Sequence, residues 1–129
     1  KSAAGNMEEF FCYKKMFGEP ERIIFTIREP SGYMASATKK FPDHEIQGLQ
    51  DVYLKLIGLH ATIGGRIFNY REGLTKESYL RFLEPLRFDE KSMEEFTFKG
   101  NSADHLVTSE MSSRFEEFLL SNKELLFQS

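Results

Sequence analysis

The chain reads RIIFTIREPSGYMASATKKF over residues 22–41, and this stretch has the clearest secondary-structure pattern in the sequence. In its first half, Ile23, Phe25 and Ile27 alternate with a second set of side chains, and the alternation resumes over Tyr33–Phe41. A period of two residues is typical of a half-buried β-strand. Glu-Pro-Ser-Gly, between the two halves, favours a turn. We therefore predict a β-hairpin over this stretch.

On both sides of the predicted hairpin, the pattern indicates other elements. From Asp43 to Gly58, apolar residues recur every three or four positions, which predicts a helix facing the core. A closing helix is predicted by an apolar stripe between positions 111 and 126, with Ser102 or Ser109 as its N-cap. The shorter predicted elements are a strand over Glu9–Lys15, a strand within Thr62–Tyr70, a helix capped by Thr75 and a strand over Glu94–Lys99.

These elements predict one compact domain of the α+β class over residues 1–129. In the predicted fold, a mixed and mostly antiparallel sheet carries the hairpin and packs against the helices. A chain of 129 residues suits a single hydrophobic core. The sequence opens at Lys1 without a Met and closes at Ser129 directly after an apolar helical pattern, so we expect a domain excised from a larger protein.

Composition narrows the class of protein. Forty per cent of the residues are hydrophobic, 13 of them are Phe and none is Trp, which is typical of a globular domain with an aromatic core. No apolar stretch approaches the roughly 18 residues of a membrane span. Cys12 is the only cysteine, so a reducing intracellular compartment is expected. The net charge of −3 argues against non-specific nucleic-acid binding, which depends on a basic surplus.

Motifs for catalysis or metal binding are missing or weak. The sequence holds none of the phosphate-loop, nucleophile-elbow or zinc-protease motifs. His44, His60 and His105 lie far apart, and none has a second His or a Cys at ligand spacing. The pair Gly64-Gly65 lacks the context of a phosphate loop and predicts a backbone turn. We therefore expect a non-catalytic domain with neither a metal nor a cofactor.

A series of segments forms an ordered pattern along the chain. Its members are KSAAG at 1–5 with FCYKK at 11–15, the stretches 23–33 and 43–58, ATIGGRIF at 61–68, FTF at 96–98 with Asn101 and Leu106, and NKELLFQ at 122–128. Taken in order, these segments resemble the middle, mRNA-cap-binding region of polymerase basic protein 2 of the orthomyxoviruses. The resemblance covers nearly the whole chain, with gaps around 16–22, 74–92 and 108–111. It is nearer to a divergent, thogotovirus-like genus than to influenza.

The resemblance implies a role in viral transcription. Domains of this family hold the 7-methylguanosine cap of host pre-mRNA, so that the viral RNA-dependent RNA polymerase can take a capped primer by cap snatching. The implied partners are the other polymerase subunits and capped host RNA, and the implied locations are the host nucleus and the virion. In such a site, aromatic faces stack on the cationic base, while a carboxylate accepts its N–H groups and a Lys assists.

Carried over by position, the resemblance assigns the stacking aromatic to Phe68. The opposing stacking position falls on Arg28, whose guanidinium is planar but repels a cationic base. The carboxylate position falls near Met34, and the Lys position falls near Leu49 or Gln50. Both polar determinants of the site are therefore missing at the expected places.

Nearby acidic residues offer substitutes for the missing carboxylate. These are Glu29 and Glu45, together with Asp43. Nothing in the pattern requires any of them to contact a base. We therefore expect binding of the mRNA cap to be weak or absent, and the domain to serve mainly as a structural part of a polymerase.

Other interpretations stay open. Phe68 is equally explained as a core residue of a Phe-rich chain. The whole sequence also fits an unrelated intracellular protein-interaction module without a ligand, and a generic enzyme ranks third. For every interpretation we expect no membrane contact, and we expect the isolated domain to be monomeric.

Overall fold

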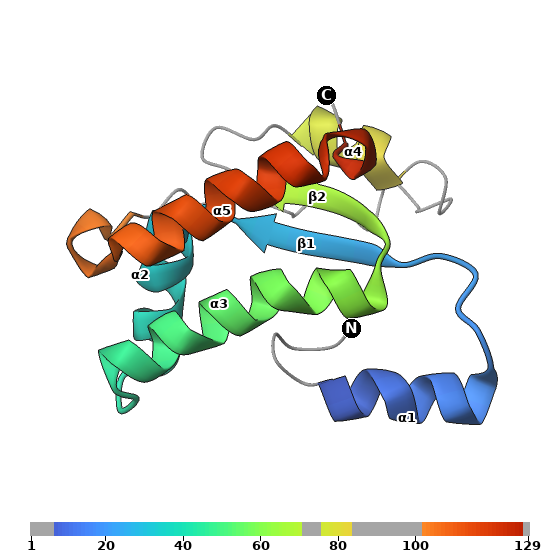
Figure 1. The fold of residues 1–129 in the computed structure, drawn as a ribbon, viewed down its shortest axis with the longest axis horizontal. Helices are drawn as coiled ribbons and strands as arrows, with labels where there is room; N and C mark the ends of the chain where they lie inside the picture. Colours follow the sequence, from blue (N-terminus) through green and yellow to red (C-terminus); the bar gives the residue numbers. More distant parts are fainter. Residues whose placement is uncertain (1–6, 71–75, 84–101, 128–129) are drawn as a thin grey trace.

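The computed structural model describes residues 7–70, 76–83 and 102–127, and these residues are mostly helical (Figure 1). The elements in chain order are α1 (Met7–Phe17), β1 (Ile24–Arg28), α2 (Pro30–Lys40), α3 (Ile46–Ile63), β2 (Arg66–Tyr70), α4 (Lys76–Leu83), the 3-10 helix η3 (Asp104–Leu106), α5 (Ser109–Ser121) and the 3-10 helix η4 (Lys123–Leu125).

The described sheet consists of β1 and β2, which run parallel from the pair Ile24–Arg66 to the pair Arg28–Tyr70. The chain end lies beside β2, because Phe127 N donates to the carbonyl of Ile67 at 2.9 Å. Parallel neighbours need a long crossover connection. Helices α2 and α3 supply this crossover between the two strands.

The predicted α+β fold with a mostly antiparallel sheet is therefore wrong. The hairpin expected over 22–41 is a strand followed by a helix, because α2 begins at Pro30, directly after β1. Proline suits the first turn of a helix as well as it suits a β-turn. The buried residues of α2 are Pro30, Gly32, Met34 and Ala37. Pro30, Met34 and Ala37, at spacings of four and three residues, share one helical face, whereas Gly32 lies on the other side beneath the side chains of Arg28 and Glu29.

The aromatic segment Glu9–Lys15 was predicted as a strand, and it lies within the helix α1. Three other predictions are confirmed in kind: α3 over most of 43–58, β2 within 62–70, and a closing helix, α5. The N-cap of α5 is Thr108, in place of Ser102 or Ser109. The strand predicted over 94–99 and the N-cap Thr75 lie outside the described residues. The short helix itself is present as α4.

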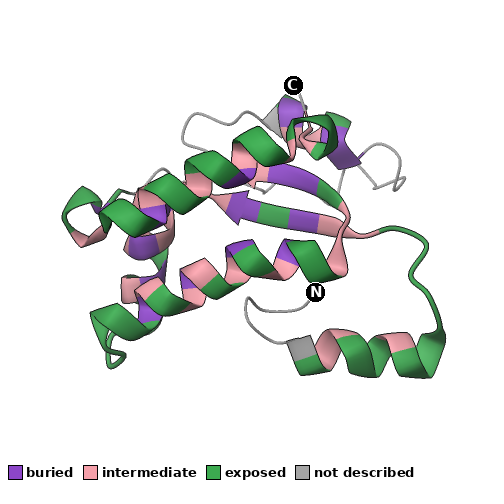
Figure 2. Ribbon diagram, viewed as in Figure 1, coloured by how far each residue is buried: buried purple, intermediate pink, exposed green. Residues whose placement is uncertain are grey.

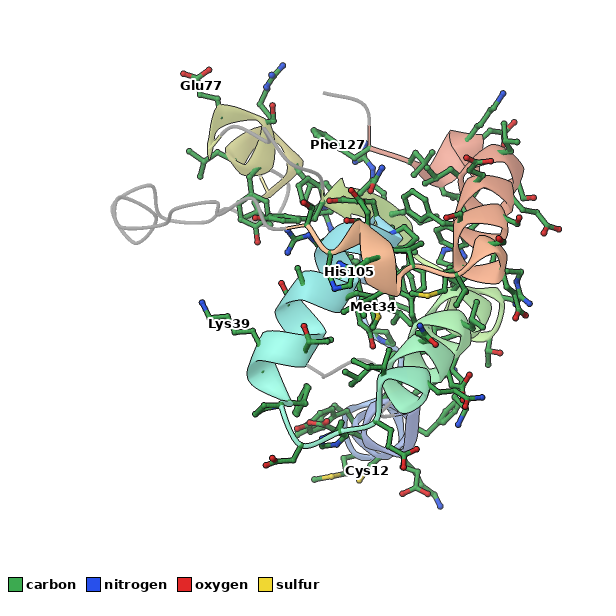
Figure 3. The ribbon with its side chains drawn as sticks, turned by 90° about the vertical axis from the view of Figure 1, so that its left-hand side faces the viewer. Cys12, Met34, Lys39, Glu77, His105 and Phe127 are labelled. Atoms are coloured by element: carbon green, nitrogen blue, oxygen red, sulfur yellow. The ribbon has the colours of Figure 1, made fainter. Side chains whose placement is uncertain are left out.

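Two hydrophobic clusters lie on opposite faces of the sheet. Phe25, Ile27 and Ile67 belong to the main core, which includes buried residues of α2, α3 and α5. Phe68 points to the other face and joins a second cluster with residues of α4. Figure 3 shows α4 and α5 on opposite sides of the strands, with Met34 inside the body. Helices therefore lie on both faces of the sheet, as is usual for parallel strands, and Thr26 of β1 remains exposed.

The predicted backbone turn at the glycine pair is confirmed between α3 and β2. Gly64 and Gly65 have φ angles of 73° and 104°, a region that favours glycine. His60 Nε2 lies 2.9 Å from the carbonyl oxygen of Gly65, and its ring meets the rings of Phe25 and Phe118. His60 is thus a structural residue that fixes this turn to the main core.

Candidate binding surfaces

The two residues that the resemblance assigns to base stacking lie on one face of the sheet. Phe68 pairs with Thr26, and Arg28 follows two positions later on the same strand as Thr26. Because side chains alternate between faces, Phe68 and Arg28 project from the same side of neighbouring strands. The structure therefore brings together the aromatic and the guanidinium that the resemblance pairs.

Phe68 is enclosed by other aromatic rings. Its side chain is 2% exposed. Its ring centroid lies 4.5 Å from that of Phe82, 5.3 Å from that of Tyr79 and 6.2 Å from that of Phe127. These rings fill the second cluster, so Phe68 presents no open face to a base in this arrangement.

Arg28 is held by contacts within the protein. Its Cζ lies 4.9 Å from the ring centroid of Tyr70, and its Nη1 donates to Ser36 Oγ at 2.9 Å. Its Nε lies 3.7 Å from Glu29 Oε1. A Cβ atom at Gly32 would lie only 2.2 Å from Arg28 Nε, so the side chain runs closely over the first turn of α2. Arg28 thus ties the sheet to α2.

The remaining candidate residues are dispersed. Glu29 is half-buried at the N-cap of α2, whereas Glu45 is exposed at the N-cap of α3. The 11-residue helix α2, about 16 Å long, separates them. Met34 and Leu49 lie in the main core. Asp43 is exposed in the turn before α3, and Gln50 Nε2 donates to the carbonyl of Leu106 at 2.9 Å. The three candidate carboxylates, Glu29, Asp43 and Glu45, therefore do not form one site.

A hollow of about 540 Å³ opens where the first turns of α2 and α5 approach each other. Hydroxyl groups dominate its lining, with one carboxylate from each side, Glu29 and Asp104. Ser31 Oγ accepts a hydrogen bond from Ala103 N at 2.9 Å, which joins the two sides. The hollow holds no aromatic platform among its lining residues, so its chemistry does not match base stacking.

Among the described residues, helix α1 presents the largest group of exposed large apolar side chains. Phe11, Tyr13, Met16 and Phe17 are 45%, 49%, 67% and 76% exposed. Figure 1 shows α1 apart from the rest of the fold, joined to β1 by an extended segment, and Figure 2 shows its surface as mostly exposed. The helix packs closely against no other described helix or strand. Exposed apolar patches of this kind mark interaction sites.

We name one side of this helix the outer face of α1, formed by Glu8, Phe11, Cys12 and Lys15. All four residues are exposed, and their spacing of three, four and seven places them along one side of the helix. Sequence reasoning missed this surface, because an aromatic run favours a strand by propensity. The helical spacing, with acidic residues first and basic residues last, was the signal that could have found it.

Ionisable groups in the core act as neutral donors. Burial raises the pKa of Tyr53 well above its usual range, and the negative charge of Glu29 adds to this rise. Burial also raises the pKa of Tyr33. The hydroxyl of Tyr53 donates to the carbonyl of Arg28 at 2.7 Å, and that of Tyr33 donates to the carbonyl of Leu49 at 2.8 Å. These two hydrogen bonds join α3 to α2 and to β1.

Within residues 7–70, 76–83 and 102–127, no group of three or more His, Cys, Asp or Glu side chains could hold a metal ion. Over the same described ranges, no helix combines the length and the apolar character that crossing a membrane demands. Comparisons of the chain with protein-family models, with curated proteins and with solved structures return no match.

Proposed function

We propose that this chain is a non-catalytic protein-interaction module that binds through α1. The observation that carries the proposal is the exposure of four large apolar side chains on one helix that packs closely against no other described helix or strand. An 11-residue helix is shorter than the roughly 12–15 residues at which isolated helices become even marginally stable in water. A partner that covers these aromatic side chains would stabilise the helix and remove apolar surface from water.

The test is binding by matched variants. In Phe11→Ser/Phe17→Ser, two exposed aromatics of α1 are lost; in the control, Leu120→Ser, an equally exposed apolar residue of α5 is lost. We expect the purified chain and the Leu120→Ser control to form a stoichiometric complex with a protein partner. We expect the double variant to lose this complex. Equal binding by all three chains, or catalytic turnover lost on one point substitution, would contradict the proposal.

A second candidate function is supported by one observation, the common sheet face of Phe68 and Arg28. It is a cap-binding-like domain of a viral polymerase subunit, as the resemblance implies, with weak or absent binding of the mRNA cap. The enclosure of Phe68 and the contacts of Arg28 favour the weak form of this function. One base–aromatic stack contributes about 1–3 kcal/mol, whereas micromolar binding requires about 8 kcal/mol.

Titration of 7-methyl-GTP against GTP tests the weak form of the second candidate. We expect millimolar or undetectable binding of both nucleotides, with little preference for the methylated base. Low-micromolar binding that depends on the methyl group and disappears in Phe68→Leu would overturn the weak form and establish an active cap-binding site. Phe68→Leu keeps an apolar side chain in the second cluster, and its thermal unfolding provides the control for folding.

A further inference from the structure

We infer that the outer face of α1 pairs with the same face of a second copy of this chain, with the two helices antiparallel about a two-fold axis. The inference rests on the proposed function, because it names a partner for one side of α1; Tyr13 and Phe17, on the opposite side, stay exposed in this pair. In a two-fold interface both copies use the same surface, which must therefore be self-complementary. If a residue of one copy contacts a second residue of the other copy, the reverse contact forms as well. The outer face of α1 is self-complementary in its charges.

The two sides of α1 differ in their pattern of exposure. On the side away from the outer face, Glu9, Phe10 and Lys14 are half-buried, whereas Tyr13 and Phe17 among them are exposed. The outer face, with Phe11 and Cys12 at its centre, is open to solvent over its whole length, and Figure 3 shows Cys12 at the edge of the molecule. Because the four residues of the outer face are exposed, this side of the helix is accessible to a second helix.

The charges select the antiparallel arrangement. Glu8 and Lys15 lie at opposite ends of the outer face, two turns apart, and neither forms an ion pair or hydrogen bond with another described residue. An antiparallel copy places its Lys15 opposite Glu8 and its Glu8 opposite Lys15. A parallel copy would place like charges together, which is destabilising. Antiparallel helices also align their macrodipoles favourably.

The neighbouring charges of α1 are already engaged within the chain. Glu9 Oε1 accepts a hydrogen bond from the hydroxyl of Tyr13 at 2.9 Å, and Lys14 Nζ lies 3.1 Å from Glu19 Oε1. Glu8 and Lys15 are thus the charges left to recognise a partner. Between them, Phe11 of each copy packs across the axis against Cys12 of the other, which supplies an aromatic anchor.

The interface formed by two such helices is small. A pair of 11-residue helices buries less than the roughly 1,200 Å² of a stable standard interface, so the dimer should be weak and dependent on concentration. Sedimentation equilibrium of the 129-residue chain should show a mass that rises from 15.0 kDa towards twice that value with increasing concentration.

Charge reversal gives the decisive test. Glu8→Lys and Lys15→Glu each turn two attractive pairs into repulsive ones, and each should lower the association constant by about tenfold. The double variant Glu8→Lys/Lys15→Glu restores attraction and should recover dimerisation. Both substitutions oppose the helix dipole, so an effect on helix stability alone would add in the double variant instead of cancelling. Lys39→Glu, at an exposed position of α2, is the control.

Cross-linking supplies a second readout. Helices packed 8–10 Å apart bring Cys12 of the two copies close to the axis. A short bismaleimide should therefore link wild-type chains and fail to link Lys15→Glu. A mass of 15.0 kDa at every concentration, or a dimer insensitive to charge reversal, overturns the inference. If the chain is monomeric yet binds a different protein that Phe11→Ser/Phe17→Ser loses, self-pairing is refuted and the proposed function stands.

Discussion

Arg28 shows how one residue can serve the fold at several points. Its carbonyl oxygen accepts a hydrogen bond from the hydroxyl of Tyr53 in α3. Its guanidinium lies over the ring of Tyr70 in β2, and its Nη1 donates a hydrogen bond to Ser36 Oγ in α2. A single residue at the end of β1 thus contacts the neighbouring strand and both crossover helices. The resemblance assigns Arg28 to a ligand, whereas its contacts serve internal packing.

Gly32→Ala is expected to destabilise the fold. The new Cβ would lie 2.2 Å from Arg28 Nε and 2.6 Å from Glu29 Oε1, so both side chains must move and the contact with Ser36 is lost. The gain in helix propensity is about 1 kcal/mol, and we expect the lost contacts to outweigh it by about 1 kcal/mol. Chemical denaturation measures the difference.

Gly58→Ala is the matched control for this prediction. A Cβ at Gly58, inside α3, meets nothing within 4 Å. We expect this variant to gain about 0.5–1 kcal/mol from helix propensity. Stabilisation of equal size in both variants would show that the close packing of Arg28 over Gly32 has no energetic consequence.

The raised pKa of Tyr53 predicts that the fold loses stability at alkaline pH. Burial is the main cause of its raised pKa, so the folded chain keeps the hydroxyl protonated where the unfolded chain ionises, above a pH of about 10. The stabilising contribution is therefore present below that pH and lost above it, by roughly 1 kcal/mol at pH 11. Unfolding free energies measured from pH 8 to 11 should fall more steeply in the wild type than in Tyr53→Phe.

Tyr33→Phe is the comparison variant for the alkaline experiment. Tyr33 also donates to a backbone carbonyl, but it is only half-buried. Its removal should change the pH slope less than the removal of Tyr53. At neutral pH, Tyr53→Phe should cost about 1–3 kcal/mol, because the carbonyl of Arg28 loses its buried donor. Identical pH slopes in all three chains would contradict the assignment.

At the scale of elements, the amphipathic pattern predicted α3, because the apolar spacing directly reflects its contact with the core. It failed at α2, where Ala, Ser, Thr and Lys fit either period and Pro30 fits either a turn or a helix start. Because the helix over residues 30–40 was not predicted, the parallel pairing of β1 and β2 was not predicted either. Once residues 30–40 form a helix, the strands are joined by a crossover and not by a turn.

The candidate stacking residues were predictable only in part. The sequence placed Phe68 on a strand, which is confirmed. Its enclosure depends on Phe82 of α4 and Phe127 at the chain end, which approach only through the tertiary fold. Strand position alone therefore could not distinguish a base-stacking aromatic from a core aromatic.

Of the helices α2, α3 and α5, only α5 begins with a side-chain cap, and Thr108→Ala removes it. Thr108 Oγ1 accepts the hydrogen bond of Met111 N at 3.2 Å, whereas Glu45 at the start of α3 makes no side-chain cap bond. We expect Thr108→Ala to lower the free energy of unfolding by about 1 kcal/mol. Glu45→Ala should change it by less than about 0.5 kcal/mol. An equal effect in denaturant titrations would argue against the cap.

At the scale of the whole molecule, the two ends of the described chain differ in their attachment. Helix α1 carries exposed residues and is joined to the body by an extended segment (Figure 1). The opposite end lies against the sheet, since Leu126 bridges to Ile67 and the ring of Phe127 packs on Phe68 and Phe82. One end is exposed, and the other is held against β2.

Variants at the two ends should therefore behave differently. Removal of residues 1–18, measured at concentrations where the chain is monomeric, should change the free energy of unfolding by less than about 0.5 kcal/mol. Phe127→Ala should lower it by about 2 kcal/mol, because a half-buried aromatic leaves a gap against Phe68 and Phe82. Thermal and chemical unfolding of both variants give these values. Strong destabilisation by the N-terminal deletion would mean that α1 is held by the body and is not available to a partner.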